Sequence, residues 1–301
     1  MTVKEHLGIN EFNHLTLHGV DLVSLCEKYG TPLFVFDEAC LIGNFERFKR
    51  AFESVYPKVI VCYSVKTNNN LALCKILCEK GAFAEVSSEL DLHIALKAGF
   101  TGDRIIYDGP FKPMQTLKRA LEEGVLLVNV ESFAEMDRLN KVAGEAGVRQ
   151  AVGIRVNSFR DPGLSKYFSL LRLIEAAYCN LDSRFGFSMD EVYAAFEKAL
   201  KLENLGVEGI MTHPYRGAIK VLLPLIHELY ENLGVEIKYL NIGGGFNPGD
   251  IRFAGGKEFI LDFMRRKIGL KSKLAEREKV LDIESVAKSV VGEIRNGLKG
   301  L

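Results

Sequence analysis

A lysine stands directly after a buried apolar run, where its amine can do covalent chemistry. Lys66 follows residues 59–64 (VIVCYS) in the segment YSVKTNNN. A lysine at the mouth of a barrel can form a Schiff base with an aldehyde when its pKa is lowered. An ordinary surface lysine is an equally weighted alternative for this position.

Three successive glycines follow the last apolar run of the chain. Gly243, Gly244 and Gly245 come directly after residues 238–242 in the segment YLNIGGGF. Backbone N–H groups of such a run can converge on an anion, and loops after the last strands of a barrel often hold phosphate. A tight turn is an equal alternative. Together with Lys66, the glycine run favours a cofactor that carries both an aldehyde and a phosphate.

A histidine and an arginine occupy comparable positions on other apolar runs. His213 follows residues 207–212, where a polar cap is the commoner role, although a flat imidazole could stack on an aromatic ring. Arg155 lies inside the segment GIRVN, near the end of a predicted buried strand. An unpaired buried charge is very costly, so Arg155 needs a partner. Glu85, on an earlier predicted strand, is the candidate for that partner.

Eight short apolar runs, rich in β-branched and aromatic residues, predict parallel strands. They cover residues 31–37, 59–64, 83–87, 104–108, 126–130, 151–156, 207–212 and 238–242. Amphipathic helical patterns lie between them, and several end at glycine. This alternation predicts a (β/α)8 barrel of the TIM type, with an open doubly wound sheet as the alternative. Active sites of such barrels lie at the carboxyl ends of the strands, where the residues above are found.

The composition limits the classes of partner. The chain has 301 residues, 48% of them hydrophobic, and 39 basic residues balance 39 acidic ones. This predicts an ordered core and gives no global electrostatic reason to expect nucleic acid or an anionic membrane. The N-terminus lacks the apolar region of a signal peptide. The six cysteines and six histidines show no zinc-ligand spacing, so we expect no metal, reduced thiols and a cytoplasmic protein.

A set of segments, in order along residues 15–250, resembles a known family. The segments are TPLFVFDE, YSVKTN, AEVSSELDLHIALKAGF, IIYDGPFKP, LVNVESFAEMDRL, VGIRVN, SRFGF and LNIGGGF. They are similar to the barrel domain of the diaminopimelate/ornithine decarboxylase family, the fold-type III enzymes that use pyridoxal 5'-phosphate (PLP). The ordered set is far more specific than any one of its motifs.

The resemblance implies a PLP site. Lys66 would carry the cofactor as an internal aldimine, and His213 would stack on its pyridine face. The other implied residues are Gly243, Gly244 and Gly245 at the phosphate, Glu85 and Arg155 beside the cofactor, and Arg184 on the substrate side. The implied reaction is decarboxylation of a diamino or basic amino acid, with the protonated pyridine ring accepting the released electrons.

The chain also departs from the family pattern. Members carry a Glu-Pro-Gly-Arg segment whose Glu pairs with the ring nitrogen, and no Glu-Pro-Gly occurs here. They also carry a C-terminal β-domain, and this chain reaches Leu301 without a β-rich segment. We therefore expect a barrel over residues 1–250 and a helical extension over 251–301.

These departures leave alternatives open for the function. A PLP-binding protein without efficient catalysis is the alternative to decarboxylation, and a barrel enzyme that acts on a phosphorylated metabolite without PLP is a third hypothesis. Expected partners are a small amino-acid substrate and either a second copy of the chain, as a homodimer, or a partner chain that supplies the missing domain.

Overall fold

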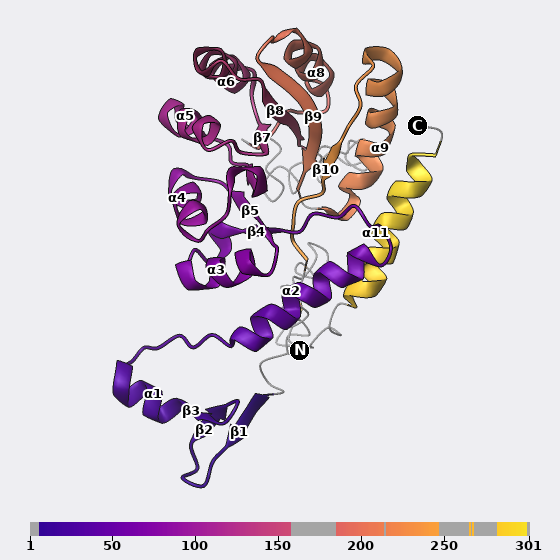
Figure 1. Cartoon of the computed structure of the whole chain (residues 1–301). Coiled ribbons are helices and arrows are strands. Elements are labelled where there is room, and N and C mark those ends of the chain that lie inside the picture. The colour runs from indigo at the N-terminus through magenta and orange to yellow at the C-terminus, as the bar shows by residue number, and fades with distance from the viewer. Residues whose placement is uncertain are drawn as a thin grey trace.

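The computed structural model describes residues 6–157, 185–213, 215–246, 265, 267 and 282–299, with only the backbone of 215–218 (Figure 1). Its main feature is one parallel sheet that curls as in an α/β barrel. The sheet has seven strands in the order β10-β9-β8-β7-β6-β5-β4, so strands adjacent in sequence are adjacent in space. The strands are β4 (Cys62–Ser64), β5 (Phe83–Val86), β6 (Ile105–Tyr107), β7 (Leu127–Val130), β8 (Gln150–Val156), β9 (Leu205–Thr212) and β10 (Tyr239–Asn241).

Helices follow the strands and cover the outer face of the sheet (Figure 1). They are α3 (Leu71–Glu79), α4 (Glu89–Lys97), α5 (Met114–Glu122), α6 (Phe133–Ala146), α8 (Val192–Lys201) and α9 (Tyr215–Leu233), and α2 (Glu38–Glu53) comes before β4. Side-chain caps explain where several begin: Asn70, Ser88 and Ser132 each accept backbone N–H groups of the first turn of α3, α4 and α6. The predicted alternation of strands and helices is confirmed for these segments.

The first predicted strand, residues 31–37, was wrong. This segment is extended but belongs to no sheet, and it links α1 (Leu22–Tyr29) to α2. Most of its side chains are exposed, with Phe34 86% accessible, and only Leu33 and Asp37 are more buried. Apolar β-branched and aromatic residues favour a strand only where a neighbouring strand supplies ladder hydrogen bonds and a packing face.

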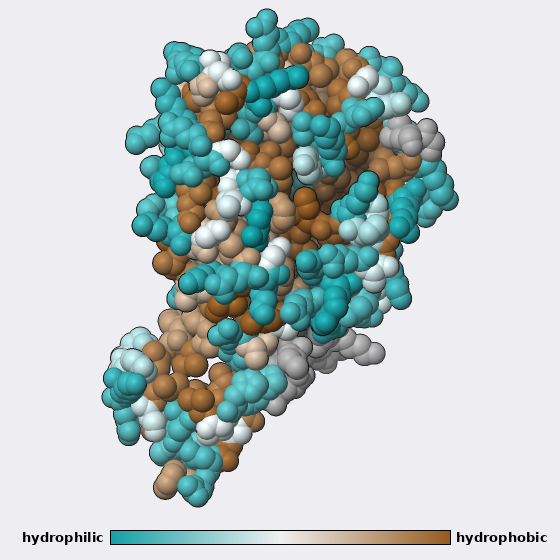
Figure 2. Space-filling model, viewed as in Figure 1, coloured by the Kyte–Doolittle hydropathy of each residue, from teal (hydrophilic) through white to brown (hydrophobic). Residues whose placement is uncertain are grey.

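The N-terminal segment forms a small antiparallel sheet that the sequence did not predict. Its strands are β1 (Leu7–Ile9), β2 (Leu15–Leu17) and β3 (Val20–Asp21), in the order β1-β2-β3. Strands of two or three residues are too short to give a period-2 pattern. The small sheet stands apart from the parallel sheet (Figure 1), and apolar side chains are exposed on this part of the molecule (Figure 2).

The core consists of two clusters of buried side chains. The larger one lies between the parallel sheet and its helices. The smaller one joins α2, α9 and α11 (Ile283–Gly297), and it includes Phe52, Leu223 and Ala287. Figure 1 shows α11 running beside α2 and α9. Within the region predicted as a helical extension, residues 283–297 form α11, whereas residues 247–264, 266 and 268–281 lie outside the described part. No helix of the described residues is long and apolar enough to span a membrane.

Candidate functional site

Lys66 lies at the carboxyl end of β4, where the chain leaves the sheet. Its Nζ is 3.0 Å from Glu85 Oε1 on the neighbouring strand β5. Ser64 and Glu85 are register partners of these two strands, and the Ser64 hydroxyl donates a hydrogen bond to the other carboxylate oxygen. The Lys66 side chain remains 58% exposed while that of Glu85 is 12% exposed. The amine is therefore oriented by a shielded carboxylate and is still open to a ligand.

The glycine run folds against His213. Gly243 has φ +68°, in the left-handed region, and a Cβ there would lie 2.6 Å from His213 Nδ1 and 2.7 Å from the Thr212 carbonyl oxygen. The Gly244 N–H donates to His213 Nδ1 at 3.1 Å. Only glycine fits at position 243, because it tolerates both the backbone angle and the close approach.

The His213 imidazole is held neutral. Burial lowers its pKa, and the positive charges of Arg155 and Lys66 lower it further, while Glu85 acts in the opposite direction. Nδ1 accepts the Gly244 N–H, so the ring proton of the neutral imidazole lies on Nε2. These charged residues and His213 stand at the carboxyl ends of β4, β5, β8 and β9, which lie at the same edge of the parallel sheet.

Arg155 does not pair with Glu85, so that prediction was wrong. Its Nη1 donates to Glu131 Oε1 at 2.7 Å, and the second Glu131 oxygen accepts the Gly186 N–H at 3.1 Å. Val130 and Ile154 are register partners of β7 and β8, so the residues that follow them are adjacent. Glu85 lies on β5, three strands from β8, and it is already engaged by Ser64 and Lys66.

Sequence reasoning missed a buried acid of this mouth. Asp108 directly follows β6, and the Asn129 side-chain amide donates a hydrogen bond to it. Burial, followed by the charge of Glu85, raises the pKa of Asp108 to about 6, although the Asn129 hydrogen bond and the charges of Arg155 and Lys112 oppose the rise. Asp108 is the last residue of the predicted strand 104–108. A search for polar residues at the carboxyl ends of predicted strands, which found Lys66, therefore also indicates Asp108.

Cys62, on β4, is not a nucleophile of this site. Burial and the charges of Asp108 and Glu85 raise the pKa of its thiol to about 12. A thiol with such a pKa remains protonated at neutral pH and reacts poorly. Lys66 is thus the nucleophile that the geometry favours.

These residues fit a cofactor that carries an aldehyde and a phosphate. The donor set offers an accessible amine, a neutral imidazole and a glycine loop without side chains. Two of the loop N–H groups are engaged in this structure, because Gly243 N donates to Asn241 Oδ1 at 2.8 Å and Gly244 N to His213 Nδ1. A phosphate held by both N–H groups would replace these acceptors. Arg184 lies outside the described residues.

Comparison with known proteins agrees with this geometry. Residues 42–263 match the family model described as "Pyridoxal-dependent decarboxylase, pyridoxal binding domain". The diaminopimelate decarboxylase of Aquifex aeolicus (strain VF5) is 38% identical over 240 residues, which are 77% of this chain and 54% of the relative. The diaminopimelate decarboxylase of Vibrio cholerae is 34% identical over 251 residues, or 80% and 57% of the two chains.

Solved structures share the fold. The crystal structure of AQ1208 from Aquifex aeolicus has a TM-score of 0.74 and 30% identity, covering 99% of this chain and 62% of that one. Diaminopimelate decarboxylase from M. jannaschii, in co-complex with L-lysine, has a TM-score of 0.76 at 23% identity and covers 98% and 64%. The chain spans about half the length of the curated relatives it matches. Since the family model covers most of the chain, this protein belongs to the pyridoxal-dependent decarboxylase family and carries its pyridoxal-binding domain.

Proposed function

We propose that this chain binds PLP through Lys66 and serves in the decarboxylation of a diamino or basic amino acid. The observation that carries the proposal is the Lys66 amine, 3.0 Å from Glu85 and in the same strand-end mouth as His213 and the glycine loop. Family membership and the diaminopimelate decarboxylase relatives support the reaction class.

Each residue of the mouth has a different role in the proposed function. PLP bound there would supply an electron-withdrawing ring, the chemistry that loss of a substrate carboxylate needs. Lys66 supplies the amine that would hold the cofactor aldehyde, and Glu85 orients that amine through the contact at 3.0 Å. His213 presents a flat, neutral ring whose orientation is fixed by the Gly244 N–H.

The charged residues nearby orient rather than react. Glu131 holds the Arg155 guanidinium at 2.7 Å, and both side chains are largely buried. A guanidinium fixed in this way places a positive charge beside the mouth without the entropy cost of a free side chain. We propose that Arg155 and Glu85 lie beside the cofactor, that Gly243, Gly244 and Gly245 hold its phosphate, and that Arg184 contacts the substrate.

The first prediction concerns the attachment residue. When the purified chain is incubated with PLP and reduced with borohydride, we expect peptide mass spectrometry to find the cofactor mass on Lys66. Lys66→Ala should abolish this labelling, because no other amine of the described mouth is oriented by Glu85. Lys75→Ala removes an exposed lysine of α3 and should leave the labelling intact. Labelling that persists in Lys66→Ala at the wild-type level would disprove the assignment.

A second candidate function is PLP binding without efficient turnover. It is favoured by the sequence, which contains no Glu-Pro-Gly segment to pair with the ring nitrogen. Release of carbon dioxide from diaminopimelate, ornithine, lysine and arginine distinguishes the two candidates. Release that depends on Lys66 supports decarboxylation, whereas Lys66 labelling without any release supports the second candidate.

A further inference from the structure

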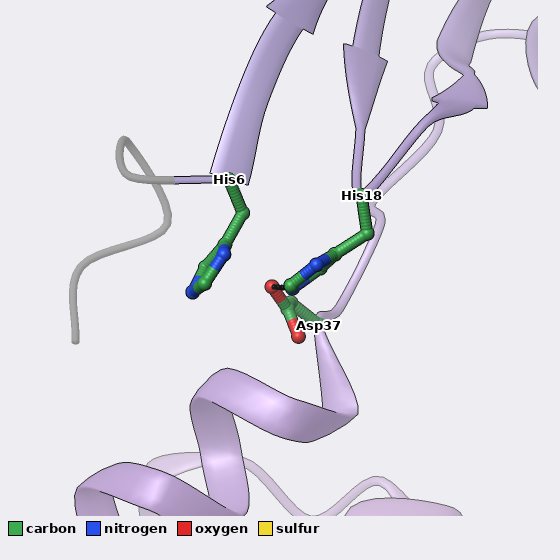
Figure 3. A group of neighbouring side chains, drawn as sticks. All are labelled: His6, His18 and Asp37. Carbon is green, nitrogen blue, oxygen red and sulfur yellow. Dashed lines mark ion pairs between the residues drawn. The ribbon is translucent and has the colours of Figure 1, made fainter.

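A cluster of two histidines and an aspartate lies in the N-terminal part of the chain, away from the strand-end mouth. His6 precedes β1, His18 lies in the turn between β2 and β3, and Asp37 precedes the first turn of α2. Figure 3 shows the three side chains converging from these segments. One ligand atom from each residue lies within 4.8 Å of the other two.

The contacts inside the cluster are close. The imidazoles of His6 and His18 stack with their centroids 3.9 Å apart and their planes 23° apart. His18 Nε2 forms an ion pair with Asp37 Oδ2 at 2.9 Å. The backbone N–H of His18 donates to the backbone carbonyl oxygen of His6 at 2.9 Å, so the main chain keeps the two histidines side by side.

The carboxylate is positioned and shielded. Asp37 Oδ1 accepts the Cys40 N–H at 2.9 Å as the N-cap of α2, which leaves Oδ2 directed at the histidines. The Asp37 side chain is only 3% exposed. His6 Nε2 and Asp37 Oδ2 are both inaccessible to solvent; within the described part of the chain Asp37 Oδ2 has the 2.9 Å contact with His18 Nε2, whereas His6 Nε2 has no hydrogen-bond partner. Buried polar atoms normally have such a partner.

We propose that His6, His18 and Asp37 form a binding site for a divalent transition metal ion of the zinc class. Imidazole nitrogen and carboxylate oxygen suit such an ion, and three protein ligands leave a fourth position for water. The backbone hydrogen bond that fixes Asp37 is the kind of outer contact that orients metal ligands. Because the ligands come from the small sheet and from α2, the ion would join these two parts of the molecule.

Binding requires a local adjustment of the side chains. Ligand atoms around a tetrahedral zinc ion lie about 3.3 Å apart, given metal–ligand distances of about 2.0–2.1 Å. The present separations extend to as much as 4.8 Å. His18 Nε2 already lies 2.9 Å from Asp37 Oδ2, so the separation that must close on metal binding is the one between His6 and these two residues.

The test is a titration of the untagged, chelator-treated chain with Co²⁺, followed by displacement with Zn²⁺. We expect one Co²⁺ per chain, a visible absorption spectrum, and a rise in the melting temperature with metal concentration. His6→Gln, His18→Asn and Asp37→Asn should each weaken binding by at least about 10-fold, because loss of even an outer-shell partner of a metal ligand typically costs about 10- to 100-fold in affinity. Asn tolerates the positive φ of His18 and also caps a helix, so these variants preserve the local fold.

The matched control is His14→Ala. His14 is another histidine of the N-terminal part, and its imidazole contacts Asp21 rather than the proposed metal ligands. Its affinity should equal that of the wild type, and circular dichroism checks that every variant is folded. The proposal is overturned if the wild type binds no Co²⁺, if the three ligand variants bind as tightly as the wild type, or if His14→Ala loses as much affinity as they do. None of these outcomes depends on PLP or on decarboxylation.

Discussion

At the scale of single residues, the mouth of the barrel is organised by short carboxylate contacts. Glu85 accepts hydrogen bonds from Lys66 and Ser64, while Glu131 accepts them from Arg155 and from the Gly186 backbone N–H. Each basic group thus has its own acid, and each acid comes from the adjacent strand. This arrangement leaves Asp108 as a buried acid whose hydrogen-bond donor is the neutral Asn129 amide.

The raised pKa of Asp108 should make the stability of the protein depend on pH. Its pKa rises from 3.8 to about 6 on folding, so the native state favours the protonated acid. Between these two values the native state binds more protons than the unfolded state, and the free energy of unfolding falls as pH rises. Asp108→Asn stays neutral and can still accept the Asn129 N–H. We expect the variant to be more stable than the wild type above pH 6, by up to about 3 kcal/mol.

Urea unfolding near pH 4 and near pH 7.5 measures this effect. The stability difference between Asp108→Asn and the wild type should be small at the lower pH and large at the higher one. Asp103→Asn, at an exposed site, controls for the loss of a carboxylate. An equal difference at both pH values would show that Asp108 is ionised as easily in the native state as in the unfolded chain.

At the scale of elements, the loop after β10 depends on close backbone approach. Gly243 and Gly234 have nearly the same positive φ, +68° and +66°, but a Cβ at Gly234 would meet no atom within 4 Å. A comparison of alanine substitutions at the two glycines therefore separates the cost of backbone strain from the cost of steric clash.

Gly234→Ala should cost about 1–2 kcal/mol in the free energy of unfolding, from the left-handed backbone alone. Gly243→Ala should cost about 1–3 kcal/mol more, because its Cβ meets His213 and the Thr212 carbonyl. We also expect Gly243→Ala to weaken PLP binding at least 10-fold, because a steric cost of about 1.4 kcal/mol corresponds to a tenfold loss of affinity. Denaturant unfolding and a PLP titration measure the two effects, and equal losses in both variants would argue against the close approach.

A buried ion pair connects the elements that follow β6 and β7. Lys112 Nζ donates to Gly109 O at 2.7 Å, to Asn129 O at 2.8 Å and to Glu135 Oε1 at 2.7 Å. The side chains of Lys112 and Glu135 are 0% and 1% exposed. The pair thus links the loop after β6 to β7 and to the first turn of α6.

Removing one partner of this pair should be severe. Glu135→Ala leaves a buried ammonium without its counter-charge, and we expect a loss of about 3–5 kcal/mol in unfolding free energy. Glu145→Ala breaks the exposed pair with Lys118 and should cost less than about 1 kcal/mol. Thermal and urea unfolding provide the measurement. A Glu135→Ala protein as stable as Glu145→Ala would mean that Lys112 finds water or another acceptor.

At the scale of the whole molecule, α11 is held mainly by apolar packing on α2 and α9. Ala287, Val290 and Val291 are buried in the cluster that contains Phe52 and Leu223. The ion pair between Arg47 and Glu284 also joins α2 to α11, but both side chains are more than 40% exposed. Exposed pairs contribute little, so burial of the apolar face is the larger effect.

Ala287→Asp tests this attachment. A carboxylate placed there would be buried among the described apolar side chains of the cluster, none of which carries a counter-charge, and we expect a loss of about 3–5 kcal/mol in unfolding free energy. Ser289→Asp adds the same group at an exposed position of α11 and should change stability by less than about 0.5 kcal/mol. If the two variants unfold at the same urea concentration, α11 does not contribute to the cooperative core.

The sequence by itself determined the succession of strands and helices and the residues at the strand ends. Hydrophobic period and caps are local, so seven of the eight predicted strands were found, and Lys66, His213 and the glycine run follow β4, β9 and β10. The sequence did not determine that residues 31–37 lack a sheet partner, because ladder pairing depends on what lies alongside.

Only the tertiary structure decided which side chains meet. Arg155 pairs with Glu131 rather than Glu85 because strand order and register place β7, not β5, beside β8. His6, His18 and Asp37 are up to 31 residues apart in the chain and show no ligand spacing, yet three short segments bring them together. The physical reason is the same in both cases: contacts between distant residues depend on how the elements pack, and a local pattern does not contain that information.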